Sequence, residues 1–198
     1  MNKNKLIDLG SHKFEGLNHL YNKNIIDSSY GIYCFEPNPN VYSEALKKLE
    51  ENTKNFQYIN LYDYAVGNKD DIVTFNLDKS KTSEACNILS DPPNLKELWK
   101  QPEWEWSKIQ VKCISANTLF KLCDIQPTDS VKIKCDIEGA EFEFLKDLLN
   151  CKNLFTVNQL IIEWHDGFWY ENRNVKIQEK NEIINEFAKM NISIMEWH

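Results

Sequence analysis

One stretch in the second half of the chain, Val131–Glu141, limits the possible fold more than any other. It begins with alternating apolar and polar residues, which is typical of a strand, and it ends in acidic residues interrupted by Gly139. Apolar residues at helical spacing then follow from Phe142 to Leu149. A strand therefore delivers carboxylates to its C-terminal end, which is where ligands bind in open α/β sheets. Acidic residues that only complement a helix dipole would give the same pattern.

The rest of the chain alternates strand and helix patterns around this stretch. Further strands are predicted at residues 5–10, 31–36, 56–66, 72–77, 111–114, 157–164 and 192–197, and helices near 14–21, 41–49, 117–123 and 175–190. This order is typical of an α/β fold with a doubly wound, mostly parallel sheet and helices on both faces. No internal repeat or linker is visible, so residues 1–198 are predicted to form a single domain.

Residues 79–108 interrupt the alternation of strands and helices. They contain Pro92, Pro93 and Pro102 together with three tryptophans. We interpret them as an excursion across the ligand-binding edge, either a lid or a loop packed by its own aromatic residues.

Composition excludes several classes of partner and compartment. The formal net charge of −7 makes a nucleic acid an unexpected partner. No apolar run is long enough to span a membrane, and no signal-peptide core follows Met1. The six cysteines form no Cys-x-x-Cys pair, and several lie in apolar runs, so we expect a reducing compartment, the cytoplasm.

The C-terminal ends of the predicted parallel strands bring polar residues to one edge. These residues are Asp8 and Gly10, Glu36, Asp63 with Tyr64 and Ala65, Asp136 with Glu138, and Glu163 with His165. An acidic residue that ends the second strand is the usual way to hold a ribose diol. No Gly-x-Gly-x-x-Gly or phosphate-binding Gly-Lys-Ser/Thr loop is present, which disfavours a nicotinamide oxidoreductase. A cofactor with a nucleoside but no phosphate is S-adenosylmethionine.

Five segments together resemble the FkbM family of S-adenosylmethionine-dependent methyltransferases. They are Ile7–Gly10, Phe35–Pro39, Tyr64–Gly67, Lys134–Glu141 with Leu145 and Lys146, and Ile162–His165. The pair Glu-Pro-Asn-Pro and Asp-x-Glu-Gly-Ala-Glu is specific, and the order fits nearly the whole chain. The resemblance implies a Rossmann-like class I methyltransferase fold. It also implies O-methylation, mostly of small molecules or sugars, with S-adenosyl-L-homocysteine as the product.

The resemblance also implies a set of cofactor-binding residues. They are Asp8, Gly10 and Ser11 at the methionine moiety, Glu36, Pro37 and Asn38 at the ribose, Asp63, Tyr64 and Ala65 at the adenine, and Asp136 near the transferable methyl. One departure concerns the first loop, where the family usually reads Asp-x-Gly-x-x-x-Gly and this chain has Phe14 at the second glycine. The loop must therefore hold the methionine end in another way. The chain also begins at its first strand, as expected of a domain cut from a longer polypeptide or of a minimal family member.

We predict that His165 and Asp136 are the catalytic residues. A sugar hydroxyl is a poor nucleophile, and removal of its proton at neutral pH suits a histidine general base. Lys134 is expected to pair with Asp136 and keep that carboxylate charged. The alternative is that His165 only caps its strand through a backbone hydrogen bond.

A divalent metal such as Mg²⁺ is a second interpretation of the same edge. The candidate ligands Asp136, Glu163 and His165, together with Asp166, carry the oxygen and imidazole groups that could hold such an ion against two substrate oxygens. The sequence leaves metal dependence open.

The residues predicted to bind the acceptor are Glu138, Trp164, Trp169 and Tyr170. Aromatic rings suit the C–H faces of a sugar or an apolar acceptor, but the same rings could also roof the core. The negative charge favours a neutral glycan or glycoside, and a glycosyltransferase is an expected fused or cooperating partner. A lipid or polyketide acceptor is the alternative. A non-catalytic binding domain is a further one, against which Asp8, Glu36 and Asp136 speak.

Overall fold

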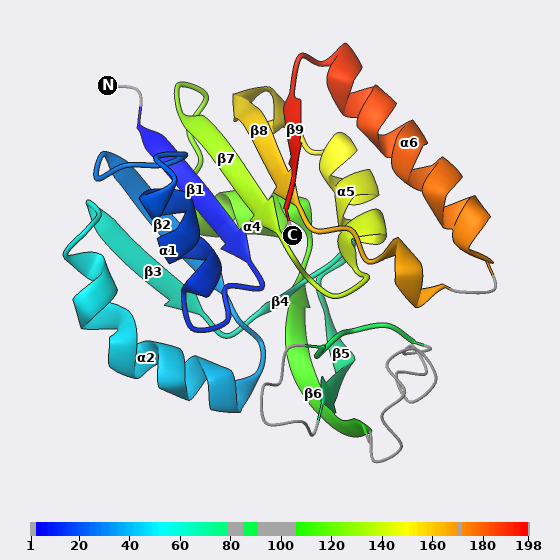
Figure 1. The fold of residues 1–198 in the computed structure, drawn as a ribbon, viewed down its shortest axis with the longest axis horizontal. Helices are drawn as coiled ribbons and strands as arrows, with labels where there is room; N and C mark the ends of the chain where they lie inside the picture. Colours follow the sequence, from blue (N-terminus) through cyan, green and yellow to red (C-terminus); the bar gives the residue numbers. More distant parts are fainter. Residues whose placement is uncertain (1–2, 79–84, 91–105, 170–171, 198) are drawn as a thin grey trace.

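A six-stranded sheet forms the centre of the computed structural model, which describes residues 3–78, 85–90, 106–169 and 172–197. The strand order is β3-β2-β1-β7-β8-β9, and every neighbouring pair is parallel (Figure 1). The strands are β1 (Asn4–Leu9), β2 (Tyr30–Phe35), β3 (Tyr58–Tyr62), β7 (Ser130–Cys135), β8 (Val157–Ile162) and β9 (Ser193–Glu196). All six carboxyl ends therefore point the same way.

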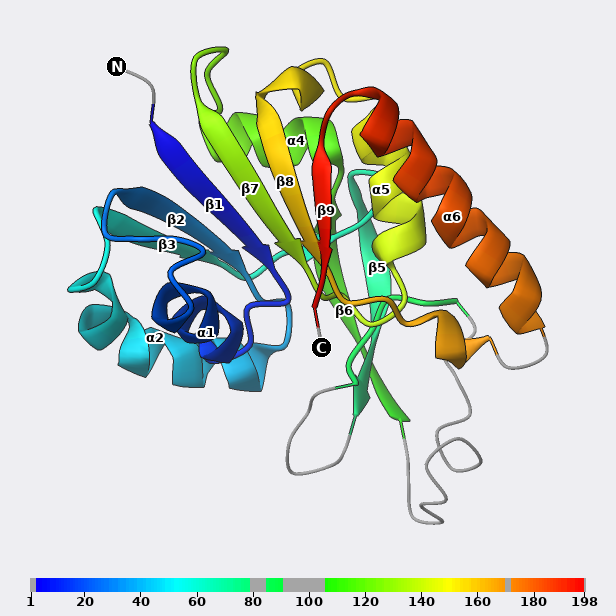
Figure 2. The ribbon, with the colours of Figure 1, turned by 45° about the horizontal axis from the view of Figure 1, so that its top comes forward.

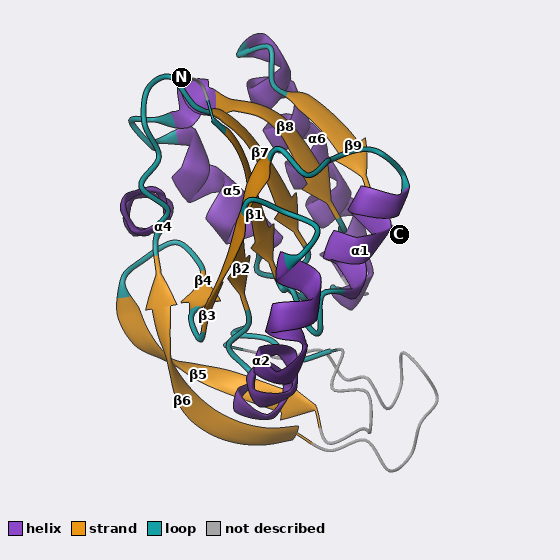
Figure 3. Ribbon diagram, turned by 90° about the vertical axis from the view of Figure 1, so that its left-hand side faces the viewer, coloured by secondary structure: helices purple, strands orange, loops and turns teal. Residues whose placement is uncertain are grey.

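Helices cover both faces of this sheet, which confirms the predicted fold class (Figure 3). The helices are α1 (Glu15–Asn22), α2 (Pro39–Thr53), α4 (Ala116–Leu122), α5 (Glu141–Leu149) and α6 (Arg173–Lys189), with short 3-10 turns η1 (Leu154–Thr156) and η2 (Asp166–Phe168). No helix within these described residues combines the length and the apolar character needed to cross a membrane.

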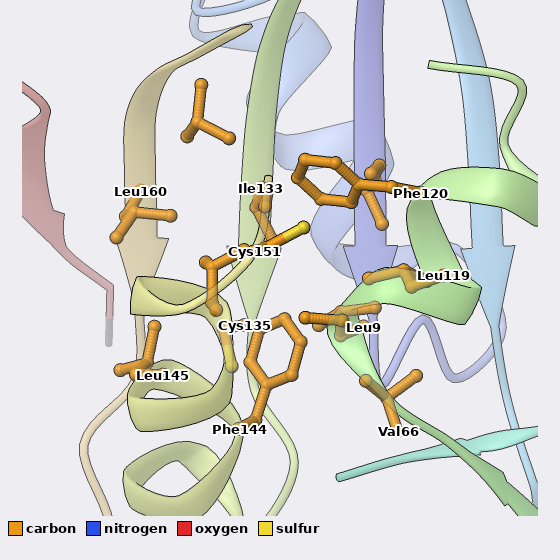
Figure 4. Close-up of a cluster of buried hydrophobic side chains, with 14 of the residues drawn as sticks. Leu9, Val66, Leu119, Phe120, Ile133, Cys135, Phe144, Leu145, Cys151 and Leu160 are labelled. Atoms are coloured by element: carbon orange, nitrogen blue, oxygen red, sulfur yellow. The ribbon is translucent and has the colours of Figure 1, made fainter. Parts of the chain in front are cut away.

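Alternation along the strands divides the core into two layers. In β1, Leu6 packs with α1 and α2, whereas Ile7 and Leu9 pack on the opposite face with α4, α5 and α6. Figure 4 shows the second layer, where Leu119 of α4 and Phe144 of α5 meet Leu9. Because both faces of the central strands are buried, these strands read as nearly continuous apolar runs.

Polar caps fix where two of the helices begin. The Asn38 side chain accepts a hydrogen bond from the backbone N–H of Asn40, and Pro39 occupies the first turn of α2. The Ser115 side chain accepts from the backbone N–H of Thr118 in the same way at α4. The cap at Asn38 starts α2 directly after the carboxyl end of β2.

A second, smaller sheet lies beyond the carboxyl ends of the central strands (Figure 2). Its order is β4-β6-β5, with β4 (Ala65–Val66), β5 (Asp71–Asp78) and β6 (Trp106–Ile114). The predicted strand at 56–66 is therefore two strands in two sheets, because Ala65 and Val66 pair with β6 instead of β2.

The predicted excursion at 79–108 ends earlier than the sequence suggested, because β6 begins at Trp106. Residues 106–108 already belong to β6 and pair with β5. The segment 85–90 lies along β5, where Asn76 and Asn87 exchange backbone hydrogen bonds of 2.7 and 3.1 Å. The remainder of the excursion lies outside the described residues, so its role as a lid stays a prediction.

Candidate active site

The carboxyl ends of β1, β2, β7 and β8 open into a cleft of about 660 Å³, a size typical of small-molecule sites. The predicted site residues that line it are Gly10, Ser11, Glu36, Pro37, Tyr64, Ala65, Asp136, Glu138, Glu163 and His165. Asp8, Asn38, Asp63, Trp164 and Trp169 are not among the lining residues, and Tyr170 lies outside the described part of the chain.

Glu36 follows β2 directly and holds a fixed, buried carboxylate in the cleft wall. Its Oε2 accepts a hydrogen bond from the backbone N–H of His12 at 3.1 Å, and its Oε1 accepts from that of Asn38 at 2.8 Å. Burial outweighs these donors and raises the pKa of Glu36 to about 7. Each carboxylate oxygen can accept a further hydrogen bond, so the group is oriented to take a pair of hydroxyls.

Gly10 allows the first turn to press against the end of β7. It has φ of 70°, and a Cβ built there would collide with the backbone carbonyl of Asp136. The backbone N–H groups of Gly10 and Ser11 both donate to the carbonyl of Phe35 at 3.1 Å. The turn therefore joins the ends of three neighbouring strands at the base of the cleft.

Lys134 forms a buried charge network beneath this turn. Its Nζ lies 3.3 Å from Oδ1 of Asp8 and 3.2 Å from Oδ2 of Asp136, so the predicted pair with Asp136 is present. Burial disfavours the charged ammonium, but the two carboxylates outweigh it and raise the pKa of Lys134 above its ordinary value. Asp8 itself is fully buried and lies beneath Lys134, on the α1 side of the sheet, and Lys134 is the member of this pair that lines the cleft. The structure thus shows Asp8 in a position that supports Lys134, and its predicted contact with the methionine moiety stays a prediction.

His165 lies between two carboxylates at the other end of the cleft. Its Nδ1 is 2.9 Å from Oε1 of Glu141, and its Nε2 is 3.3 Å from Oε2 of Glu138. Glu141 is fully buried and also accepts from the backbone N–H groups of Ile137 and Gly139. Burial favours the neutral imidazole, but Glu141 and Glu138 outweigh it and raise the pKa of His165 to about 11. The two carboxylates thus favour the protonated imidazole, and both ring nitrogens already face a hydrogen-bond acceptor, which does not support the predicted role of general base.

Three side chains at this end could hold a metal ion, in a set that differs by one residue from the sequence prediction. Asp136, Glu138 and His165 each offer a ligand atom, and these atoms all lie within 4.8 Å of one another. Glu163 lines the cleft but is not part of the set. Asp166 is directed towards Arg173 instead, at 3.8 Å.

The two tryptophans predicted to bind the acceptor pack between α5 and α6. Phe142 lies with its ring centroid 5.4 Å from those of both Trp164 and Trp169. The ammonium groups of Lys180 and Lys176 lie 5.2 Å and 4.5 Å from the ring centroids of Trp164 and Trp169, respectively. These contacts match the alternative in which the aromatic residues roof the core.

Replacing Trp169 with alanine should therefore lower stability and spare cofactor binding. We expect a loss of about 2 kcal/mol, below the range for a fully buried tryptophan because this ring is only half-buried. Chemical denaturation measures the loss, and a cofactor titration of the folded variant serves as the control. Unchanged stability together with weakened acceptor binding would instead support the predicted role of Trp169 in binding the acceptor.

Further lining residues come from segments that carry no recognisable motif. Phe75 of β5, the segment Cys86–Ile88 and Trp197 after β9 all line the cleft. Trp197 directly follows β9, and its backbone N–H donates to the carbonyl of Ile162 at the end of β8 at 2.8 Å, which places it beside the cleft. Asn38 contacts this wall from behind, since its Nδ2 donates to Sγ of Cys86 at 3.5 Å.

Comparison with known proteins gives a family and a fold. The sequence model described as the methyltransferase FkbM domain matches residues 9–193. The chain is similar to the crystal structure of methyltransferase FkbM from Methylobacillus flagellatus KT, with a TM-score of 0.53 and 14% sequence identity. The similarity covers 92% of this chain and 37% of that one, so this chain spans little more than a third of that protein. No curated protein matches the chain.

Proposed function

The chain belongs to the FkbM family of methyltransferases, and from this membership we propose that it transfers a methyl group from S-adenosyl-L-methionine to a sugar hydroxyl in a glycan or glycoside. The observation that carries the proposal is the Glu36 carboxylate, buried in the cleft wall and oriented by two backbone N–H groups. A carboxylate at the end of the second strand is the usual partner of ribose hydroxyls.

The cleft offers one group of residues to each of the three parts of this cofactor, namely its methionine, its ribose and its adenine. Gly10 and Ser11 would hold the methionine end, Glu36 the ribose, and Tyr64 with Ala65 the adenine. When bound, the cofactor would supply an electrophilic methyl group on a positively charged sulfur. Asp136, 3.2 Å from Lys134, places a carboxylate at that end of the cleft.

The acceptor would lie between the ends of β7 and β8. Glu138, Glu163 and Asn87 give that region a polar lining, which supports a sugar. Both ring nitrogens of His165 already face carboxylates, Glu138 and Glu141, and these raise its pKa, which disfavours it as the group that takes a proton from the acceptor. Activation of the hydroxyl must then come from other groups at this end of the cleft.

A lipid or polyketide-type acceptor is the second candidate. Phe75 and Ile88 form an apolar part of the wall, which favours it. The sugar proposal also loses the aromatic platform expected of Trp164 and Trp169, since both pack away from the cleft. A methyl-transfer screen over mono- and oligosaccharides beside long-chain and polyketide alcohols decides between the two. Cofactor binding without transfer to any of them would favour a non-catalytic domain.

The setting of the protein is part of the proposal. All six cysteines are free thiols, which supports a reducing compartment such as the cytoplasm. A glycosyltransferase, fused to this domain or acting before it, would supply a glycan acceptor.

Replacing Glu36 with alanine should weaken S-adenosylmethionine binding by about 1.5–3 kcal/mol, the scale of a lost hydrogen bond to a charged group. Calorimetric titration measures the change, and Glu51→Ala on the exposed side of α2 is the matched control. An intact Glu36→Ala variant with wild-type cofactor affinity would contradict the assignment of Glu36 to the ribose.

The pH dependence of the same titration gives a second check. Because burial raises the pKa of Glu36 to about 7, the carboxyl group is protonated at lower pH and must lose its proton to accept both hydroxyls. Cofactor affinity should fall by about tenfold for each pH unit below 7 and level off above it. Glu36→Gln should show weaker binding without that slope.

A further inference from the structure

We propose that Asp136, Glu138 and His165 bind a divalent cation of the Mg²⁺ or Mn²⁺ type, which selects an acceptor with two adjacent hydroxyl oxygens. This inference rests on the proposed methyl transfer and names the acceptor class and the ion at its methyl-accepting end. The three side chains come from the β7–α5 turn and from the segment after β8, and all three line the cleft.

The geometry brings three different ligand groups to one point. One atom from each of Asp136, Glu138 and His165 lies within 4.8 Å of the others, so a single ion could contact all three after small side-chain movements. Two carboxylates suit Mg²⁺ and Mn²⁺, and an imidazole completes a mixed oxygen and nitrogen set. An ion that prefers six ligands would keep three positions for water or substrate.

The imidazole is held as a metal-binding histidine usually is. Nδ1 of His165 faces the fully buried Glu141, while Nε2 faces Glu138 within the proposed set. A carboxylate on one ring nitrogen fixes the ring and the tautomer, and it leaves the other nitrogen for the metal. Glu141 is itself fixed by the backbone N–H groups of Ile137 and Gly139.

The charges around this point favour a further cation. The titratable groups around it are the carboxylates of Asp136, Glu138, Glu141 and Glu163, the imidazole of His165, and Lys134, which also pairs with Asp8. Carboxylates therefore outnumber the basic side chains at this point. Glu163 is half-buried in the cleft, and its carboxylate has no hydrogen bond or ion pair within the described residues. A bound divalent ion would offset part of this negative charge.

The open positions define the acceptor. Two neighbouring hydroxyls of a sugar ring can bind one cation together, whereas an isolated hydroxyl offers a single ligand. Metal binding would displace any proton on Nε2 of His165, and the bound ion would lower the pKa of the hydroxyl that it contacts, which supplies the activation. The hydroxyl proton leaves to solvent or to a nearby carboxylate as the oxygen–methyl bond forms and the sulfur–methyl bond breaks.

Binding of Mn²⁺ to the metal-free protein tests the proposal without any turnover. We expect one Mn²⁺ per chain by electron paramagnetic resonance, displaced by Mg²⁺, in the absence of cofactor. Glu138→Gln should abolish the site, and Glu141→Gln should weaken it by about 10–100-fold, as loss of an outer-shell partner does. Glu143→Gln, an exposed carboxylate on α5 paired with Lys146, should bind Mn²⁺ like the wild type.

A second arm tests the acceptor class. With Mn²⁺ and S-adenosylhomocysteine bound, a methyl glycoside with a cis diol should perturb the Mn²⁺ spectrum, and the analogue lacking one of the two hydroxyls should not. Equal perturbation by both would overturn the two-oxygen requirement.

The outcomes separate this inference from the proposed function. Absence of Mn²⁺ binding, or wild-type binding by a folded Glu138→Gln variant, overturns the metal site. S-adenosylmethionine calorimetry on the same samples reports the proposed function by itself, and Glu138→Gln should keep that affinity. If Mn²⁺ does not bind and an amino sugar binds the metal-free protein, the metal site is overturned. The cation that these carboxylates attract would then be the amino group of the acceptor.

Discussion

Replacing Lys134 with methionine should destabilise the fold by about 3–5 kcal/mol, the cost of leaving a buried charge without its partner. Asp8 is fully buried, and neither of its oxygens accepts a hydrogen bond within the described residues. Its compensation there is the ion pair with Lys134 at 3.3 Å. Urea denaturation of the purified variant measures the loss.

The double variant Asp8→Asn with Lys134→Met should recover most of that stability. Removing both charges leaves a neutral pair of similar size, which is often close to neutral in free energy. Lys132→Met is the matched control, because Lys132 is on the same strand but only half-buried and donates to the carbonyl of Ile25. We expect a cost of about 1 kcal/mol there. A double variant no more stable than Lys134→Met would show that the ion pair with Asp8 is not the source of the loss.

The central sheet could be predicted because its strands are buried on both faces. Runs such as Leu6–Leu9 and Ile32–Phe35 show as apolar segments, and the turns at Gly10 and Pro37 end them. The small sheet could not be predicted in the same way. No sequence signal shows that β3 ends at Tyr62 and that a new strand begins at Ala65. That break depends on β6, a strand far along the chain that pairs with Ala65.

The site residues divide according to how local their placement is. Glu36 and Gly10 were predicted because each directly follows a strand and carries a local motif. Trp164 was predicted to bind the acceptor, although alternation along the chain after β8 turns it away from the cleft. Glu163 precedes Trp164 and lines the cleft, so its neighbour faces the α5 and α6 side.

The role of Glu141 is the one that was hardest to predict from the sequence. In the sequence it is an acidic residue in the first turn of a helix, a position where carboxylates are common. In the structure it is fully buried, accepts two backbone hydrogen bonds and holds the ring of His165. The signal was a carboxylate among the apolar residues of the buried helix face, since Phe142, Phe144 and Leu145 follow it.

Replacing His165 with alanine should separate cofactor binding from methyl transfer. The proposed cofactor contacts come from Gly10, Ser11 and Glu36, at the ends of β1 and β2, so S-adenosylmethionine affinity should stay near the wild-type value. Turnover on the acceptor found by the screen should fall by about 10²–10⁴, because His165 is a ligand of the proposed ion that activates the hydroxyl, a contribution of several kcal/mol. Single-turnover transfer at saturating cofactor, beside calorimetry of the same sample, measures both quantities.

A folding defect must be distinguished from a catalytic one, because His165 also pairs with the buried Glu141. His165→Asn keeps a donor near Glu141 but offers no ring nitrogen to a metal or to the acceptor. If His165 acts on the reacting atoms, His165→Asn should melt near the wild-type temperature and still lose turnover as His165→Ala does. If the role is only structural, His165→Asn should regain both stability and turnover. Full turnover in a folded His165→Ala variant would remove the residue from the chemistry, and Asp136 would then be the group to replace at this end of the cleft.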